Sequence, residues 1–219
     1  MNGCTPSRKH AKNQSADCHS TKRSFQNIEE IVQDYIENHR DKAKAELKYF
    51  GAQPNLRTTI RVAALAINEK GKRHARQRRI PGAMLEHFRR GLSRRLESLR
   101  SCKTFPELME ITEKVAAGVW KNSKLTVYDT THRIGAYLGV EPDRIYLHAG
   151  TMESAKAVGL SAPLPFIFPS DLPKEFRRLK PCEIEDCLCR RKDALKVVRL
   201  GKTARSNAKR RHGLLNQSA

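Results

Sequence analysis

The sequence lacks any apolar run long enough to cross a membrane. Its longest clean apolar run, Val62 to Ile67, is far shorter than the ~20 residues that a membrane-spanning helix needs. The first residues contain no hydrophobic signal segment either. We therefore expect a bacterial cytoplasmic protein with no membrane partner. Association with the nucleoid is compatible with this location.

The sequence also lacks the cysteine spacing of a zinc site or a disulfide scaffold. Its six cysteines are Cys4, Cys18, Cys102, Cys182, Cys187 and Cys189. None forms the C-x2-C pair that marks a structural zinc site, and they are too sparse for a small disulfide-rich domain. We expect reduced thiols, no metal site and no cofactor.

Acidic residues are scarce in two parts of the chain, and there the positive charge accumulates. The whole chain has 43 Lys and Arg against 23 Asp and Glu, a net charge of +20. Residues 52–100 carry +10 of this excess and residues 190–219 carry +9. Such a field attracts polyanions, so the distribution favours nucleic acid as a partner. The simpler alternative is a surface that only keeps the protein soluble.

Sustained alternation of apolar and polar residues is absent, and helical periodicity takes its place. This periodicity predicts helices over 27–50, 55–67, 82–100, 104–118, 126–139 and 152–158, and one that starts after Pro181. Thr104 and Glu107 form a capping-box pattern, and Thr126 with Asp129 repeats it. We predict an all-α fold, a helical bundle formed by one domain at 25–200. Residues 1–24 and 201–219 are predicted to be disordered basic segments.

The segment 108–138 carries the pattern of two helices joined by the short turn "VWKNSKL". It resembles a helix-hairpin-helix, a unit of DNA-binding proteins in which a Gly-x-Gly turn lets backbone N–H groups approach a phosphate. Here Lys121, Asn122, Ser123 and Lys124 replace the glycines. The two lysines supply charge directly, and Asn tolerates a positive φ. The alternative is an ordinary pair of packed helices.

The core as a whole resembles the helix-hairpin-helix DNA glycosylases, within a bacterial family of helical proteins. That resemblance implies a catalytic Asp downstream of the hairpin, where this sequence has Asp143. Some glycosylases use a Lys at the hairpin helix to form a Schiff base; the matching position is Leu125, with Lys124 beside it. His148 is a further candidate for acid–base chemistry. The alternative is that Asp143 is a turn residue and that His132 and His148 are structural.

The segment "EKGKRHARQRRIP" (69–81) is rich in cations and leads into a predicted helix with arginines on one side. Arginine has a planar fork that suits phosphate, and clustered cations release several counterions together. The predicted nucleic-acid-binding residues are Lys70, Lys72, Arg73, Arg76, Arg78, Arg79, Arg89, Arg90, Arg94, Lys121, Asn122, Ser123 and Lys124.

The charge pattern predicts a nucleic-acid-binding protein that contacts duplex DNA, in preference to RNA, with low sequence specificity. We expect a binding protein rather than an enzyme. The first alternative is a DNA-repair enzyme of the glycosylase or nuclease kind, and the second is a protein that associates with RNA, the ribosome or an acidic partner. The sequence leaves the oligomeric state open.

Overall fold

The computed structural model of the chain describes residues 24–119, 124–160 and 164–199, and it confirms the all-α prediction. The helices are α1 (Ile28–Asn38), α2 (Arg40–Gly51), α3 (Leu56–Ala64), α4 (Gly82–Ser93), α5 (Leu96–Ser101), α6 (Phe105–Ala117), α7 (Lys124–Leu138), α8 (Ala149–Ala157), α9 (Pro181–Arg190) and a helical segment at 192–199. Three short 3-10 helices span Ala75–Gln77, Pro169–Asp171 and Lys174–Arg178. Two short antiparallel strands, β1 (Ile145–Tyr146) and β2 (Phe166–Ile167), form the small sheet. Within the described residues, no helix is long and apolar enough to span a membrane.

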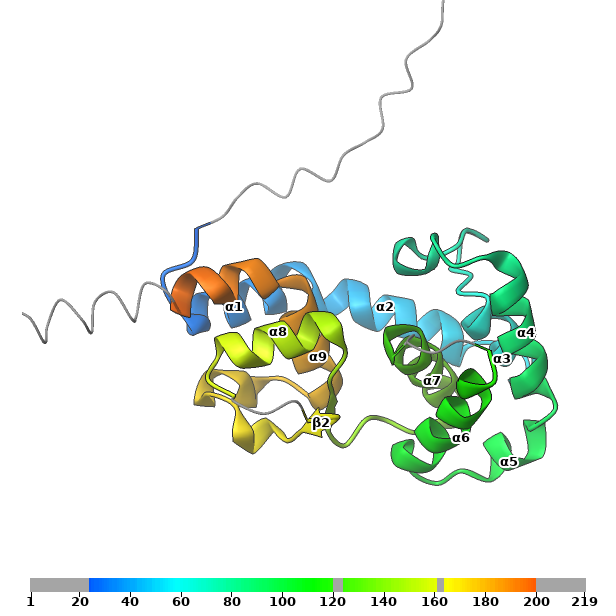
Figure 1. Cartoon of the computed structure of the whole chain (residues 1–219). Helices are drawn as coiled ribbons and strands as arrows, with labels where there is room; N and C mark the ends of the chain where they lie inside the picture. The colour runs from blue at the N-terminus through cyan, green and yellow to red at the C-terminus, as the bar shows by residue number, and fades with distance from the viewer. Residues whose placement is uncertain (1–23, 120–123, 161–163, 200–219) are drawn as a thin grey trace, which may run out of the picture.

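The described residues form two lobes, each with its own hydrophobic core. The core of the first lobe comes from α3 to α7 and the end of α2, and the core of the second lobe comes from α1, α8, α9 and the strands. Helix α2 runs from one lobe to the other (Figure 1). Both cores lie within the segment 25–200 that was predicted to be one domain. The predicted disordered segments, apart from Ser24, lie outside the described residues.

Two helices that the periodicity predicts as continuous are broken in the structure. The segment 27–50 divides at His39, whose φ of −128° is not helical, so that α1 joins the second lobe while α2 reaches the first. The segment 82–100 divides at Arg94 and Arg95 into α4 and α5. Leu92 and Leu99, on either side of that break, remain fully buried in the same core.

The predicted capping signals are confirmed for α6. Thr104 accepts a hydrogen bond from the backbone of Glu107, whose side chain accepts one from the backbone of Thr104, and the helix ends at Gly118. Helix α7 begins at Lys124, two residues before the predicted start at Thr126, and ends before Gly139, whose φ of +70° suits a residue without a side chain.

Helix α7 is the central helix of the first lobe and packs against α2, α3 and α6. Most of its residues between Thr126 and Gly135 are buried. It also carries Asp129, His132 and Arg133, which line a cleft between the lobes. The helix is therefore a buried element that presents polar groups on one side, and the turn residues Lys121, Asn122 and Ser123 before it lie outside the described part of the chain.

We predict that Gly135→Ala destabilises the protein, because α7 packs too closely for a side chain at this position. An added Cβ would lie 2.5 Å from the carbonyl oxygen of Val140, a backbone atom that cannot rotate away. Overpacking of this kind costs about 1–3 kcal/mol. Thermal or denaturant unfolding measures the loss.

The matched control is Gly118→Ala, where the nearest atom would lie 3.6 Å from the added Cβ and the φ of −80° suits alanine. We expect the control to unfold close to the wild-type midpoint. Equal midpoints for the two variants would show that the contact between Gly135 and Val140 is not tight.

Candidate functional site

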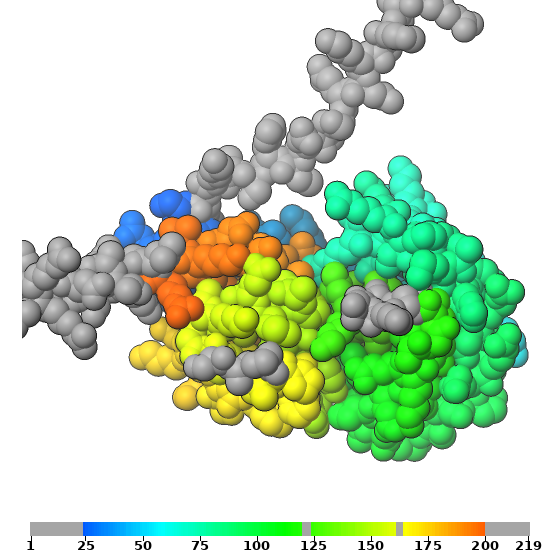
Figure 2. All heavy atoms as spheres, viewed as in Figure 1, coloured from blue at the N-terminus to red at the C-terminus, as the bar shows by residue number. Residues whose placement is uncertain are grey.

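The first lobe carries a group of exposed cations in the loop after α3 and along α4. We call this group the basic surface. Of the residues that the sequence predicts to bind nucleic acid, it contains Lys70, Lys72, Arg78, Arg79, Arg90 and Arg94. Arg57, Arg61 and Arg95 are exposed on the same lobe. None of these nine side chains forms an ion pair with another described residue. In Figures 1 and 2 the loop and α4 form the teal part of the right-hand lobe, and the loop lies at the upper edge of that lobe.

The loop of the basic surface is held by local hydrogen bonds. The side chain of Asn68 accepts hydrogen bonds from the backbone N–H groups of Lys70 and Lys72, at 3.0 and 2.9 Å. Gly71 has a φ of +68°, which a residue without a Cβ adopts at little cost. The turn therefore presents its two lysines on an ordered backbone.

Three of the predicted phosphate-binding arginines are occupied by contacts within the protein. The guanidinium of Arg73 donates a hydrogen bond to the carbonyl of Ile80 at 3.0 Å. Arg89 binds the carboxylate of Glu86, one turn earlier on α4. Arg76 faces the cleft, where it contacts two carboxylates.

The three candidate catalytic residues do not converge on one point. Asp143 binds the guanidinium of Arg144 at 2.6 Å, is half exposed and lines neither of the two main cavities. Lys124 and His148 line the same cavity of about 260 Å³, near Tyr146. Although burial opposes the charged form of His148, its hydrogen bonds with Cys189 and Glu185 raise its pKa to about 9.

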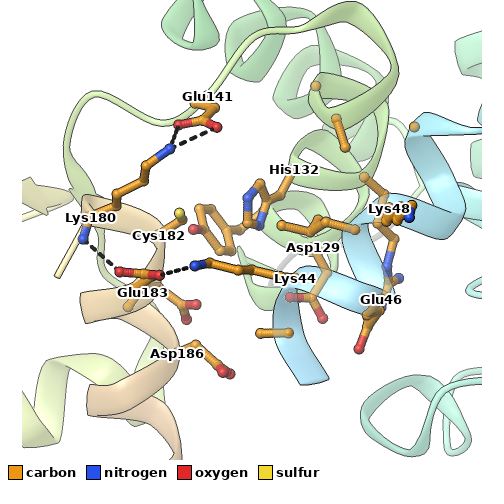
Figure 3. A pocket seen from close by; sticks show the side chains of 18 of the residues that line it. Lys44, Glu46, Lys48, Asp129, His132, Glu141, Lys180, Cys182, Glu183 and Asp186 are labelled. Carbon is orange, nitrogen blue, oxygen red and sulfur yellow. Dashed lines mark hydrogen bonds and ion pairs between the residues drawn. The ribbon is translucent and has the colours of Figure 1, made fainter. Parts of the chain in front are cut away.

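A larger cleft of about 910 Å³ lies between the two lobes, bounded by α2, α7 and α9. Figure 3 shows residues from all three helices facing it: Lys44, Glu46 and Lys48 from α2, Asp129 and His132 from α7, and Cys182, Glu183 and Asp186 from α9. Ion pairs fix the positions of many of these charges. Among them are the contact of Lys180 with Glu141 at 2.8 Å and the contact of Arg40 with Glu183 at 3.1 Å.

Arg76 joins the two lobes across this cleft. Its guanidinium lies 3.8 Å from the carboxylate of Asp129 in the first lobe and 3.1 Å from that of Asp186 in the second. Gln77 donates a hydrogen bond to Asp129 at 2.7 Å, and Arg190 binds Asp186 at 2.7 Å. No local spacing in the sequence predicts this set, because Asp129 and Asp186 belong to helices far apart in the chain.

Several buried polar atoms on the walls of the cleft have no hydrogen-bond partner among the described residues. They are His74 Nε2, Gln77 Oε1, the Tyr128 hydroxyl and Arg133 Nη1. Buried polar groups in proteins almost always have a partner, either protein or water. The set contains hydrogen-bond donors and an acceptor, so the cleft suits water or a polar ligand that can both accept and donate hydrogen bonds.

Burial favours the uncharged form of two histidines and one thiol in the cleft. Burial lowers the pKa of His132 to about 4, and burial together with nearby Arg133 lowers the pKa of His74. Burial, with a further contribution from Glu141, raises the pKa of the Cys182 thiol to about 11. Since the thiolate is the nucleophilic form, Cys182 is not an activated nucleophile at neutral pH.

We predict that protonation of His132 contributes to unfolding in acid. Because its folded pKa of about 4 lies below its unfolded value of 6.5, the unfolded chain binds more protons between these values, and stability falls as the pH falls from 6.5 to 4. His132→Gln should make the slope of unfolding free energy against pH shallower in this range, by up to ~1.4 kcal/mol per pH unit. Denaturant unfolding at several pH values measures this slope.

A suitable control is His87→Gln, because His87 is an exposed residue of α4. The control should keep the wild-type slope. A His132→Gln variant with the wild-type slope would show that this histidine already accepts a proton in the folded protein.

Comparisons with known proteins give no relative. No protein-family model, curated protein sequence or solved structure matches this chain significantly. The resemblance to helix-hairpin-helix proteins therefore stays a prediction from sequence, and the function has to be inferred from the basic surface and the cleft.

Proposed function

We propose that this protein binds duplex nucleic acid, DNA in preference to RNA, through phosphate contacts made by the basic surface. The observation that supports this proposal best is the group of exposed cations on the first lobe that have no ion-pair partner among the described residues. Contacts of this kind hold a protein on the duplex but do not read the base sequence. Low sequence specificity follows.

The acidic residues near the basic surface do little to cancel its charge. Glu86 binds Arg89 and Glu97 binds Arg100, so these four charges neutralise one another in pairs. The third acidic residue of the segment 52–100 is Glu69. The remaining cations therefore produce a positive field that attracts a polyanion and makes binding depend strongly on salt.

The spacing of the exposed arginines fits an extended row of phosphates better than a single small anion. Arg90 of α4 and Arg94, the residue that caps the end of α4, are four residues apart and lie on one side of the helix, and Arg57 and Arg61 have the same spacing on α3. Helices α3 and α4 pack against each other, which brings the two pairs onto one lobe.

The aromatic residues of the first lobe favour a duplex over a single strand as the ligand. Single-strand binding relies on exposed aromatic rings on which bases stack. Phe88 of α4 is fully buried in the core and not exposed beside the arginines. The backbone of a duplex, which needs cations and no stacking, is the better match.

Catalysis on DNA is the alternative function, and less in the geometry supports it. Asp143 is bound by Arg144 and lines neither cavity, and burial raises the pKa of the Cys182 thiol to about 11. We therefore propose binding as the activity of the basic surface. Binding to RNA or to an acidic protein is an outcome that the experiment below distinguishes.

We predict that replacing Arg78, Arg79, Arg90 and Arg94 together by Gln weakens binding to duplex DNA. Each phosphate contact contributes about 0.9 to the slope of log K against log salt concentration. The quadruple variant should therefore lose affinity at low salt and show a slope that is smaller by about 3 to 4. Fluorescence anisotropy with labelled duplex DNA, duplex RNA and single-stranded DNA across a salt series measures both quantities.

The matched control removes four exposed cations elsewhere, Lys42, Lys156, Lys174 and Arg177, by the same change to Gln. Because both variants lose the same net charge, a site at the basic surface predicts a much smaller effect in the control. Equal losses in the two variants would mean that only total charge matters, and would contradict the proposal. Tighter binding to RNA, or to an acidic protein, would support the corresponding alternative instead.

A further inference from the structure

Three metal-ligating side chains from two helices meet in the second lobe. They are His148, which directly precedes α8, and Glu185 and Cys189 of α9. One donor atom from each lies within 4.8 Å of the others, and His148 Nε2 lies 2.6 Å from Glu185 Oε1. The side chains of His148 and Glu185 are 5% and 4% exposed. We call these residues the His–Glu–Cys cluster.

The surrounding structure holds the cluster in place. Glu185 and Cys189 are four residues apart, so both point to the same side of α9. The hydroxyl of Ser154 on α8 donates a hydrogen bond to the carbonyl of Leu188 on α9 at 2.6 Å, which fixes the two helices together. The backbone N–H of His148 donates to the hydroxyl of Thr151 at 2.8 Å.

The cluster lies in the wall between the two cavities. His148 lines the cavity of about 260 Å³, Glu185 lines the cleft of about 910 Å³, and Tyr128 lines both. The Tyr128 hydroxyl is buried and has no hydrogen-bond partner among the described residues. Both cavities therefore border the cluster, one at His148 and the other at Glu185, and Tyr128, which lines both cavities, carries a polar group that no described residue uses.

The geometry points to a divalent metal site formed by His148, Glu185 and Cys189, with zinc as the best match. A sulfur, an imidazole nitrogen and a carboxylate oxygen are zinc ligands, and three protein ligands leave a fourth position for water or another ligand. The soft thiolate also disfavours magnesium and calcium, which prefer oxygen ligands alone.

Charge balance supports metal binding at this buried position. In the occupied site, the Cys189 thiolate and the Glu185 carboxylate supply two negative charges, which neutralise a divalent ion. The occupied site therefore carries no net charge, which avoids the large cost of burying an unbalanced charge.

Metal binding requires only a small rearrangement of the cluster. Ligand bonds of about 2.0–2.3 Å in a tetrahedral site separate donor atoms by roughly 3.5 Å. The contact between His148 and Glu185 would lengthen by roughly 1 Å when its proton leaves, while Cys189 would move inward.

The test is a titration of the purified full-length chain with Co²⁺, a spectroscopic substitute for zinc, after treatment with a chelator. We expect one equivalent to bind with a thiolate-to-cobalt charge-transfer band, to be displaced by Zn²⁺ and to bind more tightly as the pH rises from 6 to 8. Cys189→Ser should abolish the band and weaken binding tenfold or more. This variant leaves the contact between His148 and Glu185 in place, so it should fold even if Glu185→Gln does not.

The matched control is Cys182→Ser, because Cys182 is on the same helix but outside the cluster. It should keep both the band and the affinity. The proposal is overturned if the wild-type chain binds no Co²⁺. It is also overturned if the band survives in Cys189→Ser and disappears when Cys4 and Cys18 are replaced.

Discussion

The arrangement of the two lobes depends on the burial of charged and polar side chains between them. Helix α7 is enclosed by α2, α3 and α6, yet it carries Asp129, whose side chain is only 9% exposed, and a carboxylate removed from water in this way is unfavourable unless it is paired. Gln77 donates a hydrogen bond to that carboxylate, and Arg76 extends the network to Asp186 in the second lobe. The residues just before α4 thus belong to the contact between the lobes.

The need to pair these buried groups divides the cations of the segment 69–81 into two groups. Arg73 and Arg76 are used to hold the chain in its fold, whereas Arg78 and Arg79, only a few residues later, remain exposed. The proposed phosphate contacts and the proposed metal site therefore lie in different lobes and rest on separate observations.

Much of the fold was predictable from the sequence, because it follows from local signals. Helical periodicity and the capping residues Thr104 and Glu107 located α6, and Gly139 located the end of α7. The break at His39 was not predictable, since the apolar period continues through it and only the packing of α1 and α2 into different lobes requires it. The cationic residues were named from sequence, but the contacts within the protein that occupy Arg73, Arg76 and Arg89 were not. The His–Glu–Cys cluster left one local signal, the four-residue spacing of Glu185 and Cys189, while His148 joins them only through the packing of α8 on α9.

The measurement that tests the central claim most directly is arginine footprinting of the full-length chain with and without duplex DNA. An arginine-specific reagent followed by mass spectrometry reports which guanidinium groups the duplex covers. We expect protection at Arg78, Arg79, Arg90 and Arg94 and little change at Arg177 of the second lobe. Protection confined to the segments outside the described residues, or to arginines of the second lobe, would contradict the assignment of the basic surface as the binding site.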